Sequence, residues 1–266
     1  MKAGGSKLLA QLARLVGLVL LSGLALQIFF LARIGLMTVA DPGSTTFQRS
    51  EAWRILLQER HPAWSHQWVD YAQISPNLKR AVIASEDAGF VEHSGVEWDA
   101  LEKAWERNQK AQARVERINT QIERRLDKAR PSKARERAPP HAVARIVGGS
   151  TITQQLAKNL FLDGERHLLR KAQEFVITFM LEAVLPKRRI LEIYLNSVEW
   201  GSGIFGAEAA AQHYFRTPAS RLSALQAAQL AVMLPAPKRF EKRPASGYVL
   251  GRAGTITARM GAVELP

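Results

Sequence analysis

A long uncharged apolar run near the N-terminus is the feature that most constrains this chain. Residues 15–32 read LVGLVLLSGLALQIFFLA, and residues 34–37 can extend the run. At about 1.5 Å of rise per residue, a helix of this length nearly crosses a hydrocarbon core of about 30 Å. A secretory signal has a shorter apolar region of about 7–15 residues that ends at small residues. The sequence therefore predicts a retained transmembrane anchor over residues 15–37, rather than a cleaved signal or a buried core helix.

Basic residues before the run predict its orientation. Lys2, Lys7 and Arg14 precede it, and the positive-inside bias places the N-terminus in the cytoplasm and the rest of the chain on the far side. The expected segments are a cytoplasmic basic N-terminus at 1–14, the anchor at 15–37, a linker and membrane-proximal segment at 38–70, a soluble domain at 71–245 and a C-terminal tail at 246–266.

Composition excludes several classes of protein. The chain has 266 residues, of which 47% are hydrophobic, so it can bury one good core and is too apolar for a disordered protein. It contains no cysteine, which excludes disulfide scaffolds, Cys-ligated zinc, iron–sulfur clusters and thiol catalysis.

More than half of the net charge of +13 lies in one segment. Residues 107–137 carry eleven Lys and Arg against four acids. This segment is expected to be a solvated helix or a flexible arm. Its role stays open between two alternatives: the segment contacts anionic lipid, or it is a solvated loop with no partner. Nucleic-acid binding is disfavoured, because the segment lacks interleaved aromatic residues and lies across the membrane from the chromosome.

Helix signals dominate residues 150–234. Thr151 and Gln154 have the spacing of a capping box, and so do Ser223 and Gln226. The expected helices cover about 152–160, 168–185, 188–195 and 224–234. No alternating strand pattern stands out, so the soluble part is expected to be almost entirely α-helical.

Two acidic residues form the first candidate site. Glu86 and Asp87 follow an apolar stretch and precede Phe90, an environment that can raise a carboxyl pKa toward the range used for proton transfer. An acidic pair at the end of a helix is also a common solvated feature, so the residues alone leave both interpretations open.

Basic residues form two further candidates. The helix after Gly148 and Gly149 offers N–H groups to an anion, and Lys158 adds a positive charge, which suits a phosphate. Arg170 and Glu174 have the spacing of a helical ion pair, which is equally common on solvated surfaces.

Together these clusters resemble a known family. Five runs occur in the order EDAGFVEHSG (86–95), GGSTITQQLAKN (148–159), RKAQE (170–174), KRRILEIYLN (187–196) and GIFGAEAAAQHYF (203–215). They resemble the five motifs of the peptidoglycan glycosyltransferases over about residues 70–240. The chain has no room for the transpeptidase domain of bifunctional penicillin-binding proteins, so it resembles the short, monofunctional, membrane-anchored members.

The resemblance implies a fold, a reaction and a site. It implies a mainly α, lysozyme-like glycosyltransferase domain at 71–245 that polymerises lipid II into β-1,4-linked glycan, releasing polyprenyl pyrophosphate by inverting single displacement. Glu86 matches the general base, and Glu174 matches a second catalytic glutamate near the donor pyrophosphate and any divalent metal. The metal, Mg or Mn, stays open, and no organic cofactor is implied. The positions matching substrate-binding residues are Asp87, Phe90, His93, Thr151, Gln154, Gln155, Lys158, Asn159, Arg166, Arg170 and Lys171.

The resemblance also implies a location and partners. The chain is expected to be a single-pass protein of the bacterial inner membrane with a periplasmic catalytic domain. Its expected partners are lipid II, the growing lipid-linked glycan strand and membrane lipids, with penicillin-binding and cell-division proteins as candidates and no nucleic acid. Two alternatives are a catalytically inactive scaffold of the cell-wall machinery and a lytic, lysozyme-like hydrolase. Lys158, Arg170 and Lys171 argue against the hydrolase, which has no use for a pyrophosphate site.

One segment departs from the family pattern. Residues 108–147 look like an insertion between the first two motifs, where a mobile flap normally borders the donor groove. Our hypothesis is that this insertion binds anionic lipid or the glycan chain.

Overall fold

The structure divides into two compact units. This computed structural model describes residues 3–58, 64–128, 149–162 and 168–266. The first unit combines Met1–Gly95 with Ile152–Pro266, and the second is Val96–Thr151.

Helices make up most of the first unit, so the expected mainly α fold is confirmed. Its helices are α1 (Ala3–Leu36), α2 (Thr46–Gln58), α3 (Pro76–Glu86), α6 (Ile152–Phe161), α7 (Leu168–Val184), α8 (Lys187–Ser197), α9 (Ala207–Phe215), α10 (Ala224–Met233), α11 (Pro237–Phe240) and α12 (Gly247–Met260). Shorter elements are the 3-10 turns η1 (Tyr71–Gln73) and η2 (Ala219–Arg221) and the strands β1 (Ser65–His66), β2 (Glu199–Gly201) and β3 (Ile204–Phe205).

The N-terminal helix α1 contains the predicted anchor. Its segment Leu9–Leu36 has a mean hydropathy of 2.4 and is long and apolar enough to cross a membrane. The last turns of α1 also pack on the soluble domain. Phe30 and Ile34 are buried, and the Phe30 ring centroid lies 5.1 Å from that of Phe161, the last residue of α6. The anchor is therefore continuous with the domain core.

Arg189 of α8 binds the turn that follows α1. Its guanidinium donates to the backbone carbonyl oxygens of Met37 and Ala40, at 2.8 and 3.0 Å, and to the Asp41 carboxylate at 2.7 Å. These groups lie after Leu36, the last residue of α1, so Arg189 ties α8 to the segment that leaves the anchor. Glu192, one turn along α8, accepts from the same guanidinium and holds it in place.

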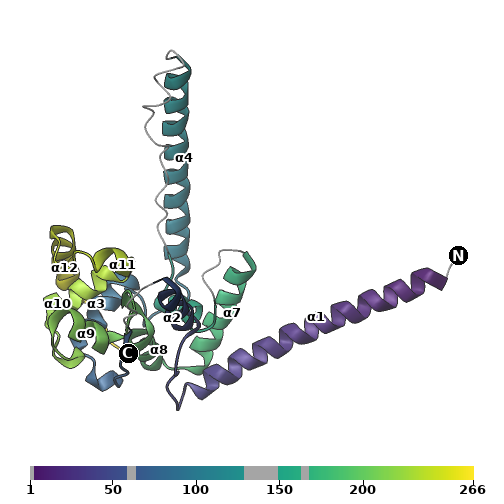
Figure 1. Ribbon diagram of the computed structural model, residues 1–266, viewed down its shortest axis with the longest axis horizontal. Helices are drawn as coiled ribbons and strands as arrows, with labels where there is room; N and C mark the ends of the chain where they lie inside the picture. Colours follow the sequence, from purple (N-terminus) through teal and green to yellow (C-terminus); the bar gives the residue numbers. More distant parts are fainter. Residues whose placement is uncertain (1–2, 59–63, 129–148, 163–167) are drawn as a thin grey trace. The chain divides into compact units, whose positions relative to one another are not determined.

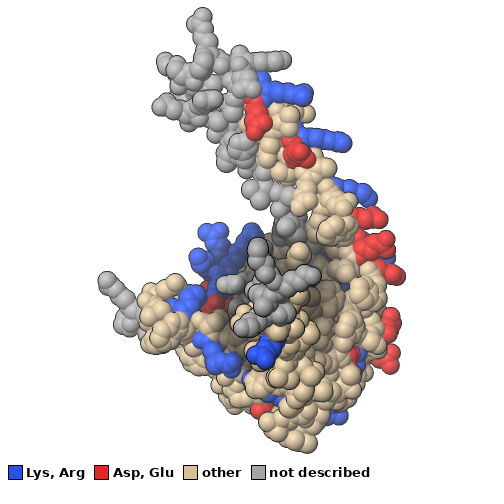
Figure 2. Space-filling view, turned by 90° about the vertical axis from the view of Figure 1, so that its right-hand side faces the viewer, with Lys and Arg blue, Asp and Glu red and all other residues tan. Residues whose placement is uncertain are grey.

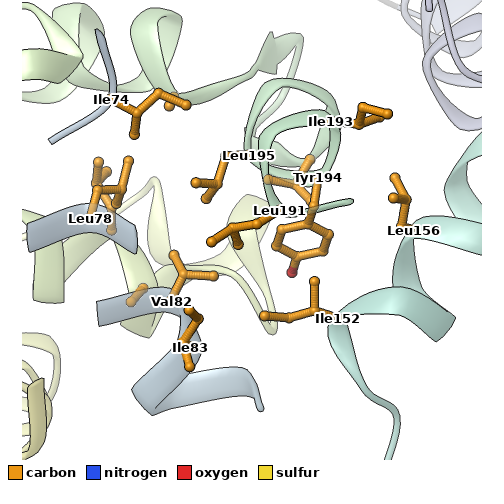
Figure 3. Packing of buried hydrophobic residues seen from close by; sticks show 14 of the residues in the cluster. Ile74, Leu78, Val82, Ile83, Ile152, Leu156, Leu191, Ile193, Tyr194 and Leu195 are labelled. Carbon is orange, nitrogen blue, oxygen red and sulfur yellow. The ribbon is translucent and has the colours of Figure 1, made fainter. Parts of the chain in front are cut away.

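The core of the first unit is built around α3. The helix α10 packs on both α3 and α12, and α12 also packs on α3 (Figure 1). Leu78, Val82 and Ile83 of α3 are almost completely buried, and Figure 3 shows Val82 pointing toward Leu191 of α8. On another side of this core, α6 packs on α2, α7 and α8. The elements that carry the candidate site residues therefore share one core.

A small sheet lies beside α8 and α9, although the sequence did not predict any strand. β3 pairs in parallel with β1, with Ser65 opposite Ile204, and antiparallel with β2, with Glu199 opposite Phe205. Strands of two or three residues are too short to produce an alternating pattern, so periodicity could not reveal them.

Two segments outside the predicted domain 71–245 are more structured than expected. The segment 38–70, expected to be a linker and membrane-proximal segment, contains α2, which begins with a reciprocal cap between Thr45 and Gln48 and packs on α6. The segment 246–266, expected to be a tail, contains α12. Val249 and Ile256 of α12 are buried in the core, because its apolar residues recur at helical spacing. Both segments therefore belong to the domain.

The second unit contains one long helix, α4 (Trp98–Lys128), in its described part (Figure 1). This helix covers the first part of the basic segment 107–137, and residues 129–137 lie outside the described residues. Between residues 98 and 124 the chain carries six basic and five acidic residues, and Figure 2 shows side chains of both signs along α4. The described part is thus a charged helix of mixed sign. The hypothesis that the insertion 108–147 binds lipid or glycan stays a prediction.

We expect α12 to contribute to stability as a core helix. Ile256→Ala should lower the free energy of unfolding by about 2–4 kcal/mol, because it removes a buried side chain and leaves a cavity. Leu250→Ala on the same helix, where the side chain is 41% exposed, should lower it by less than about 1 kcal/mol. Denaturant unfolding of the full chain in detergent, followed by tryptophan fluorescence, measures both. Equal effects would contradict the packing of α12.

Candidate active site

Glu86 lies at the end of α3, where the helix emerges from the core. The Ser75 side chain caps the start of α3 by accepting from the N–H of Asn77, and Pro76 occupies the first helical position. The Glu86 side chain is half-buried. Burial is the largest influence on this carboxyl and raises its pKa above the usual value, against hydrogen bonds from Gln155 and Ser85 that lower the pKa.

Asp87, the neighbour of Glu86, is buried and has a different environment. Its Oδ2 accepts from the backbone N–H of Ile152 at 2.9 Å, and its Oδ1 lies 2.8 Å from Nε2 of His93. The N–H of Gly95 donates to Nδ1 of the same imidazole. This pattern assigns a neutral His93 that carries its proton on Nε2 and donates it to Asp87. Asp87 and His93 therefore connect the start of α6 to the end of α3.

The turn after α3 is held by α7 and α8. Lys187, the first residue of α8, donates to the carbonyl oxygen of His93 at 2.6 Å and pairs with Glu182 of α7 at 2.9 Å. The Lys187 ammonium also lies 4.6 Å from the ring centroid of Phe90, which is fully buried. Phe90 and His93 thus shape the turn beside Glu86.

Gly95 closes this turn in a conformation that other residues rarely adopt. Its φ is +88°, and a Cβ placed there would lie 2.7 Å from Cγ2 of Thr178 and 2.8 Å from Cγ of Glu182. The turn can therefore approach α7 only because residue 95 has no side chain.

The second motif supplies α6, which the structure brings directly to Glu86. Nε2 of Gln155 donates to Oε2 of Glu86 at 3.0 Å. On the other side of this amide, the Tyr194 hydroxyl of α8 donates to Oε1 of Gln155 at 2.9 Å. Of the other predicted residues of this motif, Thr151 and Gln154 are buried, Asn159 is half-buried and Lys158 is exposed.

The third motif forms a charged cluster on α7. The Glu174 side chain is almost completely buried, and its Oε2 lies 3.2 Å from Nη1 of Arg170. Lys171 pairs with Oε1 of the same carboxylate. The predicted ion pair between Arg170 and Glu174 is therefore confirmed and includes a second cation. Arg166 lies outside the described residues.

The structure thus brings the predicted residues into two groups. Glu86, Asp87, His93 and Gln155 form one connected group, and Arg170, Lys171 and Glu174 form the other. Gln155 of the first group lies on α6, which packs on α7, the helix that carries the second group.

Comparison with known proteins identifies the family. A family model described as transglycosylase matches residues 55–138 and 136–261. The chain belongs to the transglycosylase family. It is 51% identical over 243 residues to the biosynthetic peptidoglycan transglycosylase of Burkholderia thailandensis, covering 91% of this chain and 83% of that protein. The protein of the same name in Burkholderia pseudomallei is 50% identical over 243 residues, with 91% and 83% covered. That of Paraburkholderia xenovorans is 48% identical over 248 residues, with 93% and 90% covered.

Sequence reasoning missed three residues of this transglycosylase site. Tyr194, Lys187 and Glu182 each donate or accept a hydrogen bond that orders the surroundings of Glu86. Tyr194 and Lys187 lie in the KRRILEIYLN run, so the motif signal was present, but no role followed from it. Their roles depend on contacts between helices, which spacing along the chain does not reveal.

Among the residues that the structure describes, those around Glu174 do not form a ready site for a divalent cation. Metal ions of this type prefer carboxylate oxygens that are free to coordinate. Both oxygens of Glu174 instead pair with the cations Arg170 and Lys171. A Mg or Mn ion would have to displace one of these side chains, so we derive no step through a metal.

We expect Gly95 of the transglycosylase to tolerate no side chain. Gly95→Ala should lower the free energy of unfolding by about 1–3 kcal/mol, because the new Cβ clashes with α7 and the positive φ is strained. The control is Gly251→Ala in α12, where a Cβ meets nothing within 4 Å. Since alanine favours the helix, this control should raise the free energy of unfolding by up to about 1 kcal/mol. Denaturant unfolding of the full chain measures both. Stabilisation by both substitutions would contradict the described turn.

Proposed function

We propose that the chain is a membrane-bound peptidoglycan glycosyltransferase that polymerises lipid II into β-1,4-linked glycan strands and releases polyprenyl pyrophosphate. Membership of the transglycosylase family and the names of its relatives support this function. The observation that carries it is the hydrogen bond from Gln155 to Glu86, because it joins two sequence motifs around a half-buried carboxylate.

Glu86 is the general base in this proposal. The 4-hydroxyl of the acceptor gives its proton to Glu86, its oxygen bonds to the donor anomeric carbon, and the bond from that carbon to the pyrophosphate oxygen breaks. Because attack and departure occur on opposite sides, the configuration inverts in a single displacement. Gln155 holds Oε2 of Glu86, so we assign the proton transfer to Oε1, which lies 3.5 Å from the Ser85 hydroxyl. A raised pKa makes the carboxylate a stronger base.

Lys158, Arg170 and Lys171 stabilise the leaving group in this proposal. Negative charge grows on the pyrophosphate as its bond to the sugar breaks, and preorganised cations lower the energy of that state. Glu174 acts by positioning, because its carboxylate pairs with both Arg170 and Lys171.

The two alternatives are less well supported. A lytic hydrolase needs a carboxylic acid that protonates a leaving sugar, and an ordered cluster of cations does not serve that step. A catalytically inactive scaffold needs no ordered carboxylate, whereas Glu86 accepts from a side chain that a buried tyrosine holds.

We further propose that the chain is a single-pass protein of the bacterial inner membrane with its N-terminus in the cytoplasm and its catalytic domain in the periplasm. The span within α1 and the basic residues before it support this topology. Penicillin-binding and cell-division proteins are proposed partners, because they act on the same glycan at the same membrane.

One face of α7 is proposed to lie in the outer leaflet, which makes membrane lipids a partner. Leu168, Leu169, Val176 and Phe179 are between 41% and 89% exposed. Gln173 of the same helix exchanges two hydrogen bonds of 2.9 Å with Gln27 of α1. Gln27 lies about 14 Å along the helix axis before Leu36, within the apolar run. Contact at that depth, with the polar pair satisfied internally, supports a lipid-facing α7.

We expect Glu86→Gln to abolish glycan polymerisation. The amide cannot accept the proton, so the rate with purified lipid II should fall by about 10²–10⁴-fold. Glu92→Gln, at an exposed acid on the same turn, should keep the wild-type rate. Both are measured on detergent-purified full chain with products sized on a gel. Polymer from Glu86→Gln at the wild-type rate would exclude Glu86 as the base, and cleavage of preformed glycan by the wild type would favour the hydrolase.

We expect the exposed face of α7 to be shielded in a bilayer. The chain has no native cysteine, so single substitutions report on one position each. Val176→Cys and Leu250→Cys form a matched pair, because both native side chains are 41% exposed. In nanodiscs, a water-soluble maleimide should label Val176→Cys at least about tenfold more slowly, because hydrocarbon disfavours the reactive thiolate. Equal labelling rates would place α7 in water.

A further inference from the structure

Tyr194 connects the core to the proposed base through one intervening side chain. The residue lies on α8 and is completely buried. Figure 3 shows its ring extending from α8 toward Ile152 at the start of α6. Its hydroxyl donates to Oε1 of Gln155 at 2.9 Å, and Nε2 of Gln155 donates to Oε2 of Glu86 at 3.0 Å. The three side chains form a hydrogen-bonded chain that runs from the core to Glu86.

The direction of this chain is determined by the charge at its end. A carboxylate only accepts hydrogen bonds, so the Gln155 amide must present its NH₂ group to Glu86 and its oxygen to Tyr194. Burial, together with the charges of Glu86 and Asp87, raises the pKa of Tyr194 well above its usual value, so the hydroxyl keeps the proton that it donates. The Tyr194 hydroxyl therefore donates to Gln155, and the Gln155 amide donates to Glu86. Neighbouring hydrogen bonds in such a chain strengthen each other.

We propose that Tyr194 is a positioning residue for glycosyl transfer, because it holds the Gln155 amide in the orientation that directs its NH₂ group to Glu86. This inference rests on the proposed role of Glu86 as the base. Tyr194 does not touch the substrate in this proposal. It acts through Gln155, by keeping the carboxylate in one orientation and leaving Oε1 for the acceptor proton.

The proposal predicts a specific change in pH dependence. The hydrogen bond from Gln155 lowers the pKa of Glu86, whereas burial and the adjacent Asp87 raise it. Without the Tyr194 hydroxyl, the Gln155 oxygen loses its partner, the amide can rotate, and the hydrogen bond to Glu86 weakens. The pKa of Glu86 then rises. As the pH falls, Glu86 therefore becomes protonated, and stops acting as a base, at a higher pH than in the wild type. The acid limb of the pH profile of kcat/KM should therefore move to higher pH.

The experiment compares Tyr194→Phe with the wild type in full-length, detergent-purified protein. Initial rates with lipid II are measured across the acid limb. We expect kcat/KM of Tyr194→Phe to fall by about threefold to tenfold on this limb, the usual range for one hydrogen bond, and the limb to shift upward. The control is Tyr214→Phe, which removes a hydroxyl that donates to the backbone of Trp200 elsewhere in the domain. It should leave the limb where it is.

A double-mutant cycle separates positioning from general destabilisation. If Tyr194 acts through Gln155, then Tyr194→Phe should cost nothing further in a Gln155→Ala background. Additive losses, or a Tyr194→Phe profile that matches the wild type, would overturn the proposal. Thermal unfolding of each variant confirms that the folded proteins are compared. Glu86→Gln, assayed alongside, distinguishes a failure of the proposed base from a failure of the role of Tyr194. Wild-type activity of Glu86→Gln would exclude Glu86 as the base. Loss of activity in Glu86→Gln, together with an unchanged Tyr194→Phe profile, would exclude only the role of Tyr194.

Discussion

The hydrogen bonds to the buried Asp87 carboxylate are the interactions on which the rest of the site depends. A buried carboxylate is costly unless it is well paired, and Asp87 satisfies its oxygens with the N–H of Ile152 and with neutral His93. The first N–H groups of a helix are unpaired and carry partial positive charge, so the start of α6 is a suitable partner. This contact places α6 against the end of α3. Gln155, one turn later, consequently reaches Glu86.

The same domain also connects the site to the membrane. Arg189 binds carbonyl groups of the turn that follows α1, and Gln173 pairs with Gln27 inside the apolar run. The anchor is therefore joined to the domain through α7 and α8, the helices that also carry Glu174 and Tyr194. A substrate whose lipid tail stays in the bilayer would meet an enzyme whose charged cluster lies on a helix in contact with the anchor.

Much of the site could be predicted from the sequence because motifs and helix spacing are local properties. The ion pair between Arg170 and Glu174 follows from their separation on one helix, and the structure confirms it. The capping box at Ser223 is likewise confirmed. The small sheet and the packing of α12 were not predicted, since two-residue strands leave no periodic pattern and packing of a C-terminal helix depends on the distant helices α3 and α10.

The sequence by itself determined the anchor, the mainly helical fold and the identity of the candidate site residues. An apolar run needs no tertiary partner to prefer a membrane, and helix caps act within four residues. Only the tertiary structure decided how those residues act together. The bonds from Ile152 to Asp87, from Gln155 to Glu86 and from Tyr194 to Gln155 join positions 65, 69 and 39 residues apart. Such contacts depend on how helices pack in three dimensions, because residues this distant along the chain share no local pattern.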